Sequence, residues 1–528
     1  LMFVILVTAQ IQVAPLPKEY ENTNIMYALS DIEFQCKYQN GNNCQQHVID
    51  NFIYFKKILY PRNNPYTVEE YKQLNVENPI SKIEALIEFD TEKVDIMTLN
   101  EEYELAIDQQ NGIKIKAKNN FGFSRALATL IQLSDLYKPL ENDKKAYSIK
   151  KAFIKDSPAY KWRQLLIDCS RHYQSIASLE KQIDALALTK MNVLHLHAVD
   201  AESFPVKFSK LPQSDLIKGA YHKAFYYSVE DLKQLQKYAF MRGVILYLEF
   251  DLPGHVYSWR FADPRIVAYC PSKTNINNWA INPAYPRTYE FIRGVLEETL
   301  IDFFTDSNIV PMIHLGGDEV VGACWQEDPE VAEYLRINNL TTAELWREIH
   351  DKIYGIIDEI MGQQKRYQVY WNDAMDNGNR FDNSSVVHYW EHTNKAAALE
   401  LNHKIIQSTH WYLDQMHPGS TNFYFFQDTW QDMYKIEILD GVPVDKHHLI
   451  LGGGPCQWAE YVHEQSIGAH MYPRAIAVAE VLWTNPKSRA ITNELKERIE
   501  HLGCKMYQAK LGVGAINPGK PCLGEESP

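Results

Sequence analysis

After about residue 150, eight apolar, strand-like segments follow one another, and most are followed by an amphipathic helical segment. Eight alternating β/α units over roughly 350 residues predict a closed parallel (β/α)8 barrel with insertions, and a doubly wound open sheet is the alternative. The segments are RQLLID (163–168), MNVLHLHAVD (191–200), VILYLEFD (244–251), PMIHLGGDE (311–319), RYQVYWND (366–373), SSVVHYWE (384–391), KIIQSTHWYLD (404–414) and HLILGGGPCQWAE (448–460).

The part before residue 150 has a different pattern. Short alternating runs, SKIEALIEF (81–89) and GIKIKAKNN (112–120), are mixed with a helical segment, FSRALATLIQLSDLY (123–137). This mixture predicts a smaller α+β domain over residues 18–150, with the barrel over 151–528. The apolar run at 1–7 and the small and polar residues after it predict a partial signal peptide over 1–17, although an N-terminal strand would also fit.

The charge of the chain excludes some classes of binding partner. The formal net charge is -14, and no basic stripe could neutralise phosphates, so we expect neither a nucleic-acid partner nor an anionic membrane surface. No stretch is long and apolar enough to cross a bilayer. Eight cysteines and the sequons at Asn339 and Asn383 fit the secretory pathway, in an acidic organelle or outside the cell.

Polar and aromatic residues end the predicted strands. In a barrel all carboxyl ends lie on one face, which is where barrel enzymes place their chemistry. Tryptophans stack on sugar faces and carboxylates bind hydroxyl groups, so this mouth predicts sugar chemistry. The residues concerned are Asp168 with Arg171, His197 with Asp200, Asp251 with His255, Asp318 with Glu319, Trp371, Trp390 with Glu391, Trp411 with Tyr412 and Asp414, and Trp458 with Glu460.

Cleavage of a glycosidic bond needs a protonated carboxyl group beside the leaving oxygen. Glu319 is the candidate, and we expect the charge of Asp318 to raise its pKa. Each feature also has an ordinary structural interpretation, because such acids often cap helices and strand-end tryptophans are often core. His195 and His197 share one side of a strand, but no thiolate pair or H-E-x-x-H spacing supports zinc, and no cofactor is implied.

The motifs resemble glycoside hydrolase family 20, the β-N-acetylhexosaminidases, particularly the eukaryotic lysosomal and secreted members. The resemblance runs through nearly the whole chain and implies a (β/α)8 catalytic barrel preceded by an α+β (zincin-like) domain. It rests on DCSRHY (168–173), MNVLHLHAVDAESFP (191–205), EFDLPGH (249–255), HLGGDE (314–319), WYLD (411–414), CQWAEYV (456–462) and YPRAIAVAEVLW (472–483).

The resemblance implies that the substrate's own 2-acetamido oxygen attacks the anomeric carbon, so two adjacent acids suffice. The expected product is a terminal β-linked N-acetylglucosamine or N-acetylgalactosamine released from a glycan. The implied roles are Asp318 as stabiliser, Glu319 as acid and base, Asp200 and His255 as its relay, Tyr412 as donor to the acetamide, Arg171, Glu460 and Asp414 as ligands of the sugar hydroxyls, and Trp371, Trp390 and Trp458 as aromatic walls.

Further details follow from the same resemblance. Relatives that accept 6-sulfated sugars carry Asn-Arg where this chain has Asp414-Gln415, so we expect neutral substrates only. Ala201 stands where relatives commonly have a second Asp. The implied disulfides are Cys270 with Cys324 and Cys504 with Cys522, and Cys36 with Cys44 is a plausible local pair. A homodimer is a state common in the family.

Two other functions stay open on the sequence alone. A barrel glycosidase with its own nucleophile would need a second carboxylate roughly 5 to 5.5 Å from Glu319, with Glu460 or Asp251 as candidates. A sugar-binding protein without activity would need no proton donor, and the presence of Glu319, Asp318 and Tyr412 argues against it.

Overall fold

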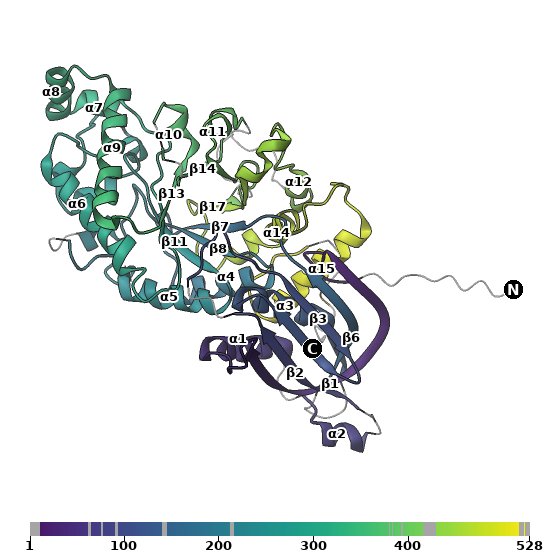
Figure 1. Ribbon diagram of the computed structural model, residues 1–528. Helices are drawn as coiled ribbons and strands as arrows, with labels where there is room; N and C mark the ends of the chain where they lie inside the picture. Colours follow the sequence, from purple (N-terminus) through teal and green to yellow (C-terminus); the bar gives the residue numbers. More distant parts are fainter. Residues whose placement is uncertain are drawn as a thin grey trace.

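The computed structural model has a smaller N-terminal α+β part packed beside a large barrel (Figure 1). It describes residues 11–61, 65–74, 76, 78–89, 93–139, 145–211, 216–379, 381–382, 384–391, 394–414, 429–516 and 522. Asn383 and Gln415 lie outside the described residues.

The N-terminal part is a six-stranded mixed sheet with strand order β1-β2-β4-β3-β6-β5. Helix α3 (Asn120–Leu133) is buried along its whole length and packs against α1 (Gln46–Leu59). The helix expected over 123–137 is therefore too long, because the chain turns into β5 at Ser134. The other elements are β1 (Glu19–Tyr38), α2 (Val68–Gln73), β2 (Ile80–Ile87), β3 (Tyr103–Asp108), β4 (Gly112–Ala117), β5 (Ser134–Pro139) and β6 (Lys145–Asp156).

Two expected boundaries differ from the structure. Residue 150 lies inside β6, whose pairing with β3 continues to Asp156, so the barrel begins after that residue. Residues 11–17, placed in the expected signal peptide, pack into the fold: Val13 and Ala14 are fully buried, and the Ala14 amide donates to Gln132 Oε1 at 2.8 Å. This part of the segment belongs to the folded body.

Eight parallel strands close the barrel, as the strand pattern predicted. They run β7-β8-β11-β12-β13-β14-β15-β16, and β16 pairs with β7, which also pairs with the short β17. The bounds are β7 (Trp162–Asp168), β8 (Val193–Val199), β11 (Ile245–Phe250), β12 (Met312–His314), β13 (Tyr367–Trp371), β14 (Val386–Tyr389), β15 (Lys404–Gln407), β16 (Ile450–Gly453) and β17 (Cys456–Gln457).

Helices surround the barrel, and several begin at side-chain caps that the sequence supplies. Thr341 and Glu344 form a capping box at the start of α9, and Ser228 and Asp231 do so for α5. The helices are α4 (Ile176–Leu188), α5 (Val229–Met241), α6 (Pro286–Glu297), α7 (Ala323–Glu327), α8 (Pro329–Asn338), α9 (Thr342–Met361), α10 (Asn372–Asp376), α11 (Ala396–Glu400), α12 (Trp430–Lys435), α13 (Ile467–Met471), α14 (Arg474–Thr484) and α15 (Asn493–Gln508). A minor pair, β9 (Val206–Lys207) and β10 (Tyr227–Ser228), lies among the loops.

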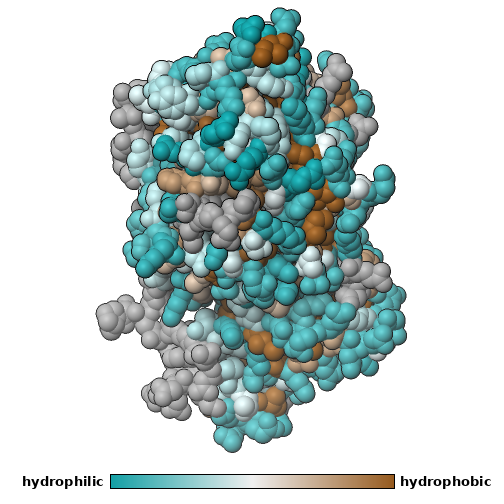
Figure 2. All heavy atoms as spheres, turned by 90° about the vertical axis from the view of Figure 1, so that its left-hand side faces the viewer, coloured by the Kyte–Doolittle hydropathy of each residue, from teal (hydrophilic) through white to brown (hydrophobic). Residues whose placement is uncertain are grey.

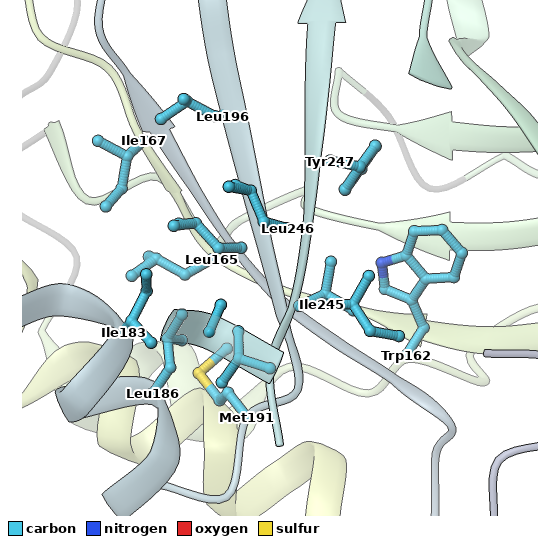
Figure 3. Close-up of a cluster of buried hydrophobic side chains, with 14 of the residues drawn as sticks. Trp162, Leu165, Ile167, Ile183, Leu186, Met191, Leu196, Ile245, Leu246 and Tyr247 are labelled. Atoms are coloured by element: carbon cyan, nitrogen blue, oxygen red, sulfur yellow. The ribbon is translucent and has the colours of Figure 1, made fainter. Parts of the chain in front are cut away.

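Alternation along the strands separates two kinds of core. Leu194 and Leu196 of β8 belong to the buried apolar core. Figure 3 shows Leu196 among the apolar side chains of the neighbouring strands and α4. His195 and His197, on the other side of the same strand, contact Glu249 of β11. The barrel interior beneath the mouth is therefore polar, in contrast to the apolar layer outside it.

Buried ion pairs fix the N-terminal part to the barrel. Glu101 is 1% exposed and pairs with Arg125 of α3 at 2.9 Å and with Arg163 of β7 at 2.6 Å. Lys190 pairs with Asp156 at 2.9 Å, also without exposure to solvent. Charged side chains of the N-terminal part are paired with charged side chains of the barrel. Separating the two parts would therefore leave buried charges without a partner.

The outer surface is mostly hydrophilic on the face shown in Figure 2, and its hydrophobic residues form separate areas. None of the helices in the described part of the chain has the length and apolar character needed to cross a membrane. The structure joins Cys36 to Cys44, Cys270 to Cys324 and Cys504 to Cys522, the same pairs that the sequence suggested, and leaves Cys169 and Cys456 as buried thiols.

Candidate active site

A double-glycine turn after β12 leads into the two adjacent acids. Gly316 and Gly317 have φ values of +64° and +91°, a region that favours glycine. A Cβ on Gly316 would lie 1.9 Å from Asp251 Oδ1, so only glycine fits there. The turn leaves Asp318 9% exposed, whereas the side chain of Glu319 is 56% exposed. Neighbours in sequence thus occupy two different environments.

A chain of charged groups connects Asp200 to Glu319. His255 Nδ1 lies 3.1 Å from Asp200 Oδ1, and its Nε2 lies 3.4 Å from Glu319 Oε2. Burial alone would lower the pKa of His255, but Asp200 and Asp251 raise it well above its usual value. His255 is therefore a cation between two carboxylates, in the order Asp200, His255, Glu319 that the resemblance implied.

The expected pKa shift of Glu319 is wrong for the free protein. Its pKa is lowered, first by the close contact with His255 and also by the charge of that imidazolium, which outweigh partial burial. The charge of Asp318 does not dominate, since the mostly exposed Glu319 side chain is turned toward His255. In the empty site Glu319 is ionised at neutral pH.

Two further acids near Asp318 have raised pKa values. Burial and the charge of Asp318 raise the pKa of Asp251 well above its usual value, and its Oδ1 accepts from the Gly317 amide at 2.8 Å. Burial, then Asp318, raises the pKa of Asp373 to about 6. Burial also raises the pKa of Asp318, against the charge of His255 and a hydrogen bond with Asp251. A neutral Asp251 can therefore donate to an ionised Asp318.

Arg171 contacts several acidic side chains on another side of the mouth. Its Nη2 lies 2.9 Å from Asp200 Oδ2 and its Nε donates to Glu202 Oε2 at 3.0 Å. Asp168, although predicted at the mouth, is fully buried and binds backbone amides, including that of Ala459 at 3.1 Å. It fixes the loops after β7 and β17 to each other.

Asp414 and Glu460 belong to the same acidic group. Burial, then the charge of Glu460, raises the pKa of Asp414 to about 8. Desolvation likewise raises the pKa of Glu460, whereas the charge of Arg171 lowers it. Burial raises the pKa of Glu202 to about 7, again against Arg171. Several carboxyl groups here share one guanidinium, and ionising all of them would bring like charges together. This part of the mouth is therefore suited to bind neutral hydroxyl groups.

The aromatic side chains are held by hydrogen bonds at their edges. Trp371 Nε1 donates to Glu249 Oε1 at 2.7 Å, and Trp390 Nε1 donates to Asp373 Oδ2 at 2.6 Å. Trp390 lies 6.3 Å from Tyr412, and Trp458 lies 6.2 Å from Trp371, between ring centroids. Trp458 also lies under the Arg171 guanidinium at 5.3 Å. Fixed indoles of this kind form ready-made walls for a sugar ring.

Two expectations for the mouth need correction. Trp411 is fully buried, and its Nε1 donates to the Met433 carbonyl at 3.1 Å, so it packs on α12 and does not line the mouth. His197 uses both ring nitrogens, Nδ1 at 2.7 Å from Glu249 and Nε2 at 2.8 Å from Asp200. It has no nitrogen left for the metal that was weighed for His195 and His197.

Three histidines lie close together in the barrel interior. Ligand atoms of His195, His314 and His388 lie within 4.8 Å of one another. However, the rings of His195 and His314 are stacked, with centroids 4.7 Å apart and an interplanar angle of 23°. Since the lone pair of an imidazole nitrogen lies in the ring plane, stacked rings do not direct both lone pairs at one ion.

Glu249 was quoted in a motif but given no role. It is fully buried and lies within 3.1 Å of His195, His197 and His314 as well as Trp371. Asp373 and Glu202 were also missed as functional groups. Each is an acid at the end of a predicted strand or in the loop after it, and this position alone could have marked it as a candidate site residue.

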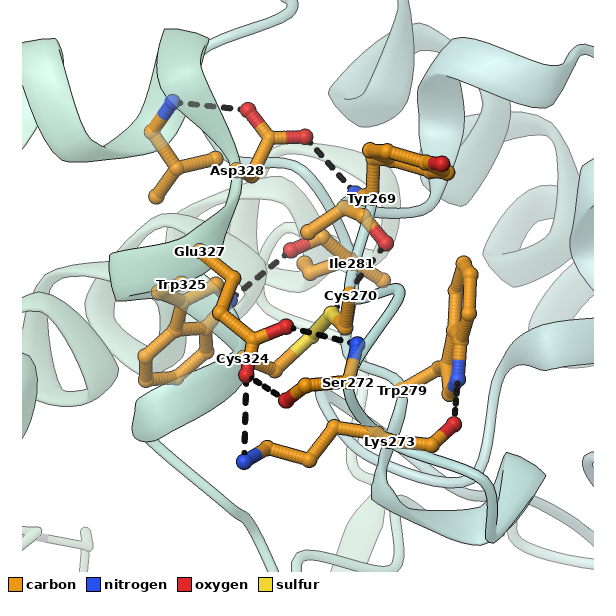
Figure 4. The surroundings of a disulfide bond; sticks show 12 residues. Tyr269, Cys270, Ser272, Lys273, Trp279, Ile281, Cys324, Trp325, Glu327 and Asp328 are labelled. Carbon is orange, nitrogen blue, oxygen red and sulfur yellow. Dashed lines mark hydrogen bonds and ion pairs between the residues drawn. A yellow bond between two sulfur atoms is a disulfide. The ribbon is translucent and has the colours of Figure 1, made fainter.

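The segment after Glu319 is tied down by a disulfide. Cys270 bonds to Cys324 at the start of α7, and Trp325 Nε1 donates to the Ile281 carbonyl at 2.9 Å (Figure 4). Glu327 and Asp328 accept from the backbone amides of Ser272 and Tyr269. These contacts hold the loop that carries Asp318 and Glu319 against the loop after β11.

Known proteins show the same organisation. Residues 160–486 match the model of glycosyl hydrolase family 20, catalytic domain, and residues 13–133 match a beta-acetyl hexosaminidase like domain. The chain is 33% identical to beta-hexosaminidase subunit A1 of Dictyostelium discoideum over 80% of its length and 76% of that protein. It is 30% identical to the human beta-hexosaminidase subunit beta over 80% of its length and 73% of that protein.

A solved structure supports the fold. The exo β-N-acetylglucosaminidase of Vibrio harveyi, in complex with N-acetylglucosamine, superposes with a TM-score of 0.77 at 22% identity, covering 96% of this chain and 79% of the other. The family match extends over more than half of the chain, and the barrel carries the acids and tryptophans that glycoside cleavage needs. The chain therefore belongs to glycosyl hydrolase family 20, the β-N-acetylhexosaminidases that act by substrate-assisted catalysis, and is a glycoside hydrolase.

Proposed function

We propose that the protein removes terminal, non-reducing β-linked N-acetylglucosamine or N-acetylgalactosamine from neutral glycans, with Asp318 and Glu319 as its catalytic acids. The observation that supports this most is that the two acids, which follow the Gly316–Gly317 turn, lie in different environments. One acid is buried beside Asp251, whose protonated carboxyl group can donate to it, and the other is open and in contact with His255.

In the proposed first step, Glu319 in its protonated form donates to the glycosidic oxygen as that bond breaks. The substrate's 2-acetamido oxygen attacks C1 and forms an oxazolinium ion. Asp318, held by a neutral Asp251, orients the acetamide N–H and stabilises the positive charge, and Tyr412 donates to the acetamide oxygen. The acetamide packs between Trp371, Trp390 and Trp458.

In the proposed second step, ionised Glu319 accepts a proton from a water molecule that attacks C1 from the side the leaving group occupied. The ring of the oxazolinium opens, and the sugar leaves with its original β configuration. Because His255 lowers the pKa of Glu319 in the free protein, the protonated form that starts the reaction is favoured by acidic pH. The same shift keeps Glu319 ionised, so that it is ready to accept a proton in this second step.

Arg171, Asp414 and Glu460 are the proposed ligands of the remaining hydroxyl groups, with Asp414 at O6. An enzyme with its own nucleophile is less well supported. Asp251 is only 2% exposed and already accepts from the Gly317 amide, so it does not reach an anomeric carbon. Glu460 shares the acidic corner of Arg171 and has a raised pKa, whereas a nucleophile must be ionised.

The cellular setting belongs to the same proposal. Three disulfides support passage through the secretory pathway, to a lysosome-like organelle or to the outside of the cell. The requirement for protonated Glu319 favours an acidic compartment. Relatives are named as subunits, which supports a homodimer. The molar mass in solution, measured by light scattering, tests this.

The direct test is the release of a fluorogenic aglycone from a β-N-acetylglucosaminide between about pH 4 and pH 7. We expect activity in the wild type and a loss of about 10²- to 10⁴-fold in Glu319→Gln, the usual contribution of a general acid. Asp318→Asn should also lose activity while both variants stay folded. A Glu319→Gln variant with nearly wild-type activity would contradict the proposed assignment.

A further inference from the structure

Glu202 lies in the loop after β8, and that loop is fixed to the one that carries Arg171. The Ser170 hydroxyl donates to the Ser203 carbonyl at 2.9 Å, and the Ser203 hydroxyl donates to the Ser170 carbonyl at 2.8 Å. Arg171 follows Ser170 in the sequence and Glu202 precedes Ser203, so these hydrogen bonds hold Arg171 and Glu202 opposite each other. The side chain of Glu202 is 26% exposed.

The donors of Arg171 are only partly used by protein acceptors. Nε donates to Glu202 and Nη2 lies close to Asp200. Nη1 is 3.5 Å from Asp168 Oδ2, too far for a good hydrogen bond, and it has no other hydrogen-bond partner among the described residues. This nitrogen is buried in the free protein, so Arg171 can meet a hydroxyl group only through the small part of its side chain that remains exposed, 7%.

A hydroxyl group both accepts and donates, so a site that recognises it needs a donor and an acceptor side by side. Arg171 supplies the donor. Glu202 supplies a carboxylate in contact with the same guanidinium, at the partly exposed side of the cluster. Tyr221, whose ring is 55% exposed, lies near enough for the charge of Glu202 to raise its phenol pKa, after the effect of burial.

We propose that Glu202 is a specificity-determining residue that accepts a hydrogen bond from a hydroxyl group on the O3–O4 edge of the terminal sugar. This rests on the proposed function, which places that edge against Arg171. Glu202 then forms a pair with Arg171 for one hydroxyl group, in the corner that Glu460 and Asp414 also line. The site therefore requires a free hydroxyl group there and rejects a substituent at O3 or O4 that removes its hydrogen.

The test compares kcat/KM of the wild type, Glu202→Ala and Glu202→Gln on three fluorogenic glycosides: the parent β-N-acetylglucosaminide and its 3-deoxy and 4-deoxy analogues. Glu202→Ala should lose about 10- to 100-fold on the parent, the value of a hydrogen bond to a charged group. On the analogue that lacks the contacted hydroxyl, the same variant should lose almost nothing. Glu202→Gln keeps an acceptor and should recover part of the loss.

A matched control is Glu464→Ala, which removes an exposed acid that accepts from the Ser175 amide at the start of α4. It should leave all three rates unchanged. Equal losses of Glu202→Ala on all three glycosides would mean a structural role and overturn the proposal, as would no loss on any of them.

Calorimetric binding of N-acetylglucosamine gives a readout that does not depend on turnover. We expect weaker binding to Glu202→Ala than to the wild type, and unchanged affinity would overturn the proposal. The two proposals fail in different ways. A wild type that binds the sugar but does not hydrolyse the glycoside contradicts the proposed function alone, whereas an active wild type with unaltered hydroxyl specificity in Glu202→Ala contradicts only the role of Glu202.

Discussion

Substituting Glu249 by Gln removes the one carboxylate that several barrel side chains share. Glu249 is fully buried, and its oxygens lie 2.7 Å from His197 Nδ1, 2.8 Å from His195 Nε2 and 2.7 Å from Trp371 Nε1. The amide keeps the size of the side chain but loses its charge and replaces an acceptor with a donor. His197, which keeps a second contact with Asp200, becomes a buried cation with one partner fewer.

The magnitude follows from breaking a buried ion pair by removing one partner, which costs about 3 to 5 kcal/mol of unfolding free energy. Burial alone would raise the pKa of Glu249, but the three histidines lower it well below its usual value. Its contribution to stability is therefore present above about pH 4.5 and lost as the pH falls.

The pKa of His197 is raised well above its usual value by Glu249 and Asp200, against burial. Its contribution is present below about pH 6.5 and lost as the pH rises through the raised pKa. The stability difference between the wild type and Glu249→Gln should thus be largest between about pH 4.5 and pH 6.5.

Urea unfolding followed by tryptophan fluorescence at about pH 5.5 and about pH 8 measures this difference. Glu298→Gln is the matched control, because Glu298 is also fully buried but accepts only from neutral donors of Ser209 and Lys210. It should cost less, about 1 to 3 kcal/mol, without the same pH dependence. Equal costs in both variants, or a Glu249→Gln cost that does not change with pH, would refute the reasoning.

Three further predictions concern the site. Asp251→Asn should keep most of the kcat because the amide still donates to Asp318, whereas Asp251→Ala should lose it. Equal kcat values in the two variants would mean that no such donor is needed. A 6-sulfated arylglycoside should be hydrolysed much more slowly than the unsulfated one, since the sulfate would face Asp414 and Glu460, and comparable rates would contradict this placement. Cys169 and Cys456 should resist alkylation in the native protein, because burial raises the pKa of both thiols, and they should react only after unfolding. Rapid labelling of these thiols in the native protein would show that the mouth opens further than it does in the structure.

The strand pattern could predict the barrel and most of the site because both depend on local sequence. Apolar runs of strand length, each ending in a polar residue, place side chains such as Trp371 and Asp318 at one mouth whatever the loops do. The expected boundary near residue 150 falls inside β6, because a polar segment and a strand overlap there. Lys145 and Lys150 are polar residues, yet they belong to β6, whose place in the sheet depends on β1 and β3.

Electrostatics could not be predicted from neighbours in sequence. Asp318 adjoins Glu319 in the chain, but one side chain is buried and the other mostly exposed, and the group that sets the pKa of Glu319 is His255, 64 positions earlier. Glu249 and Glu202 were overlooked for the same reason. Their importance comes from partners on other strands and loops, Trp371 and Arg171, that only the folded chain brings to them.

Inhibition by the N-acetylglucosamine thiazoline, a stable mimic of the oxazolinium intermediate, tests the central claim most directly. If the acetamido group is the nucleophile, the thiazoline should bind at least about 10²-fold more tightly than N-acetylglucosamine, as transition-state analogues do. Asp318→Asn should lose most of that advantage, because the charge opposite the ring is gone. A thiazoline that binds no better than the sugar itself, with an active wild type, would contradict substrate-assisted catalysis by Asp318 and Glu319.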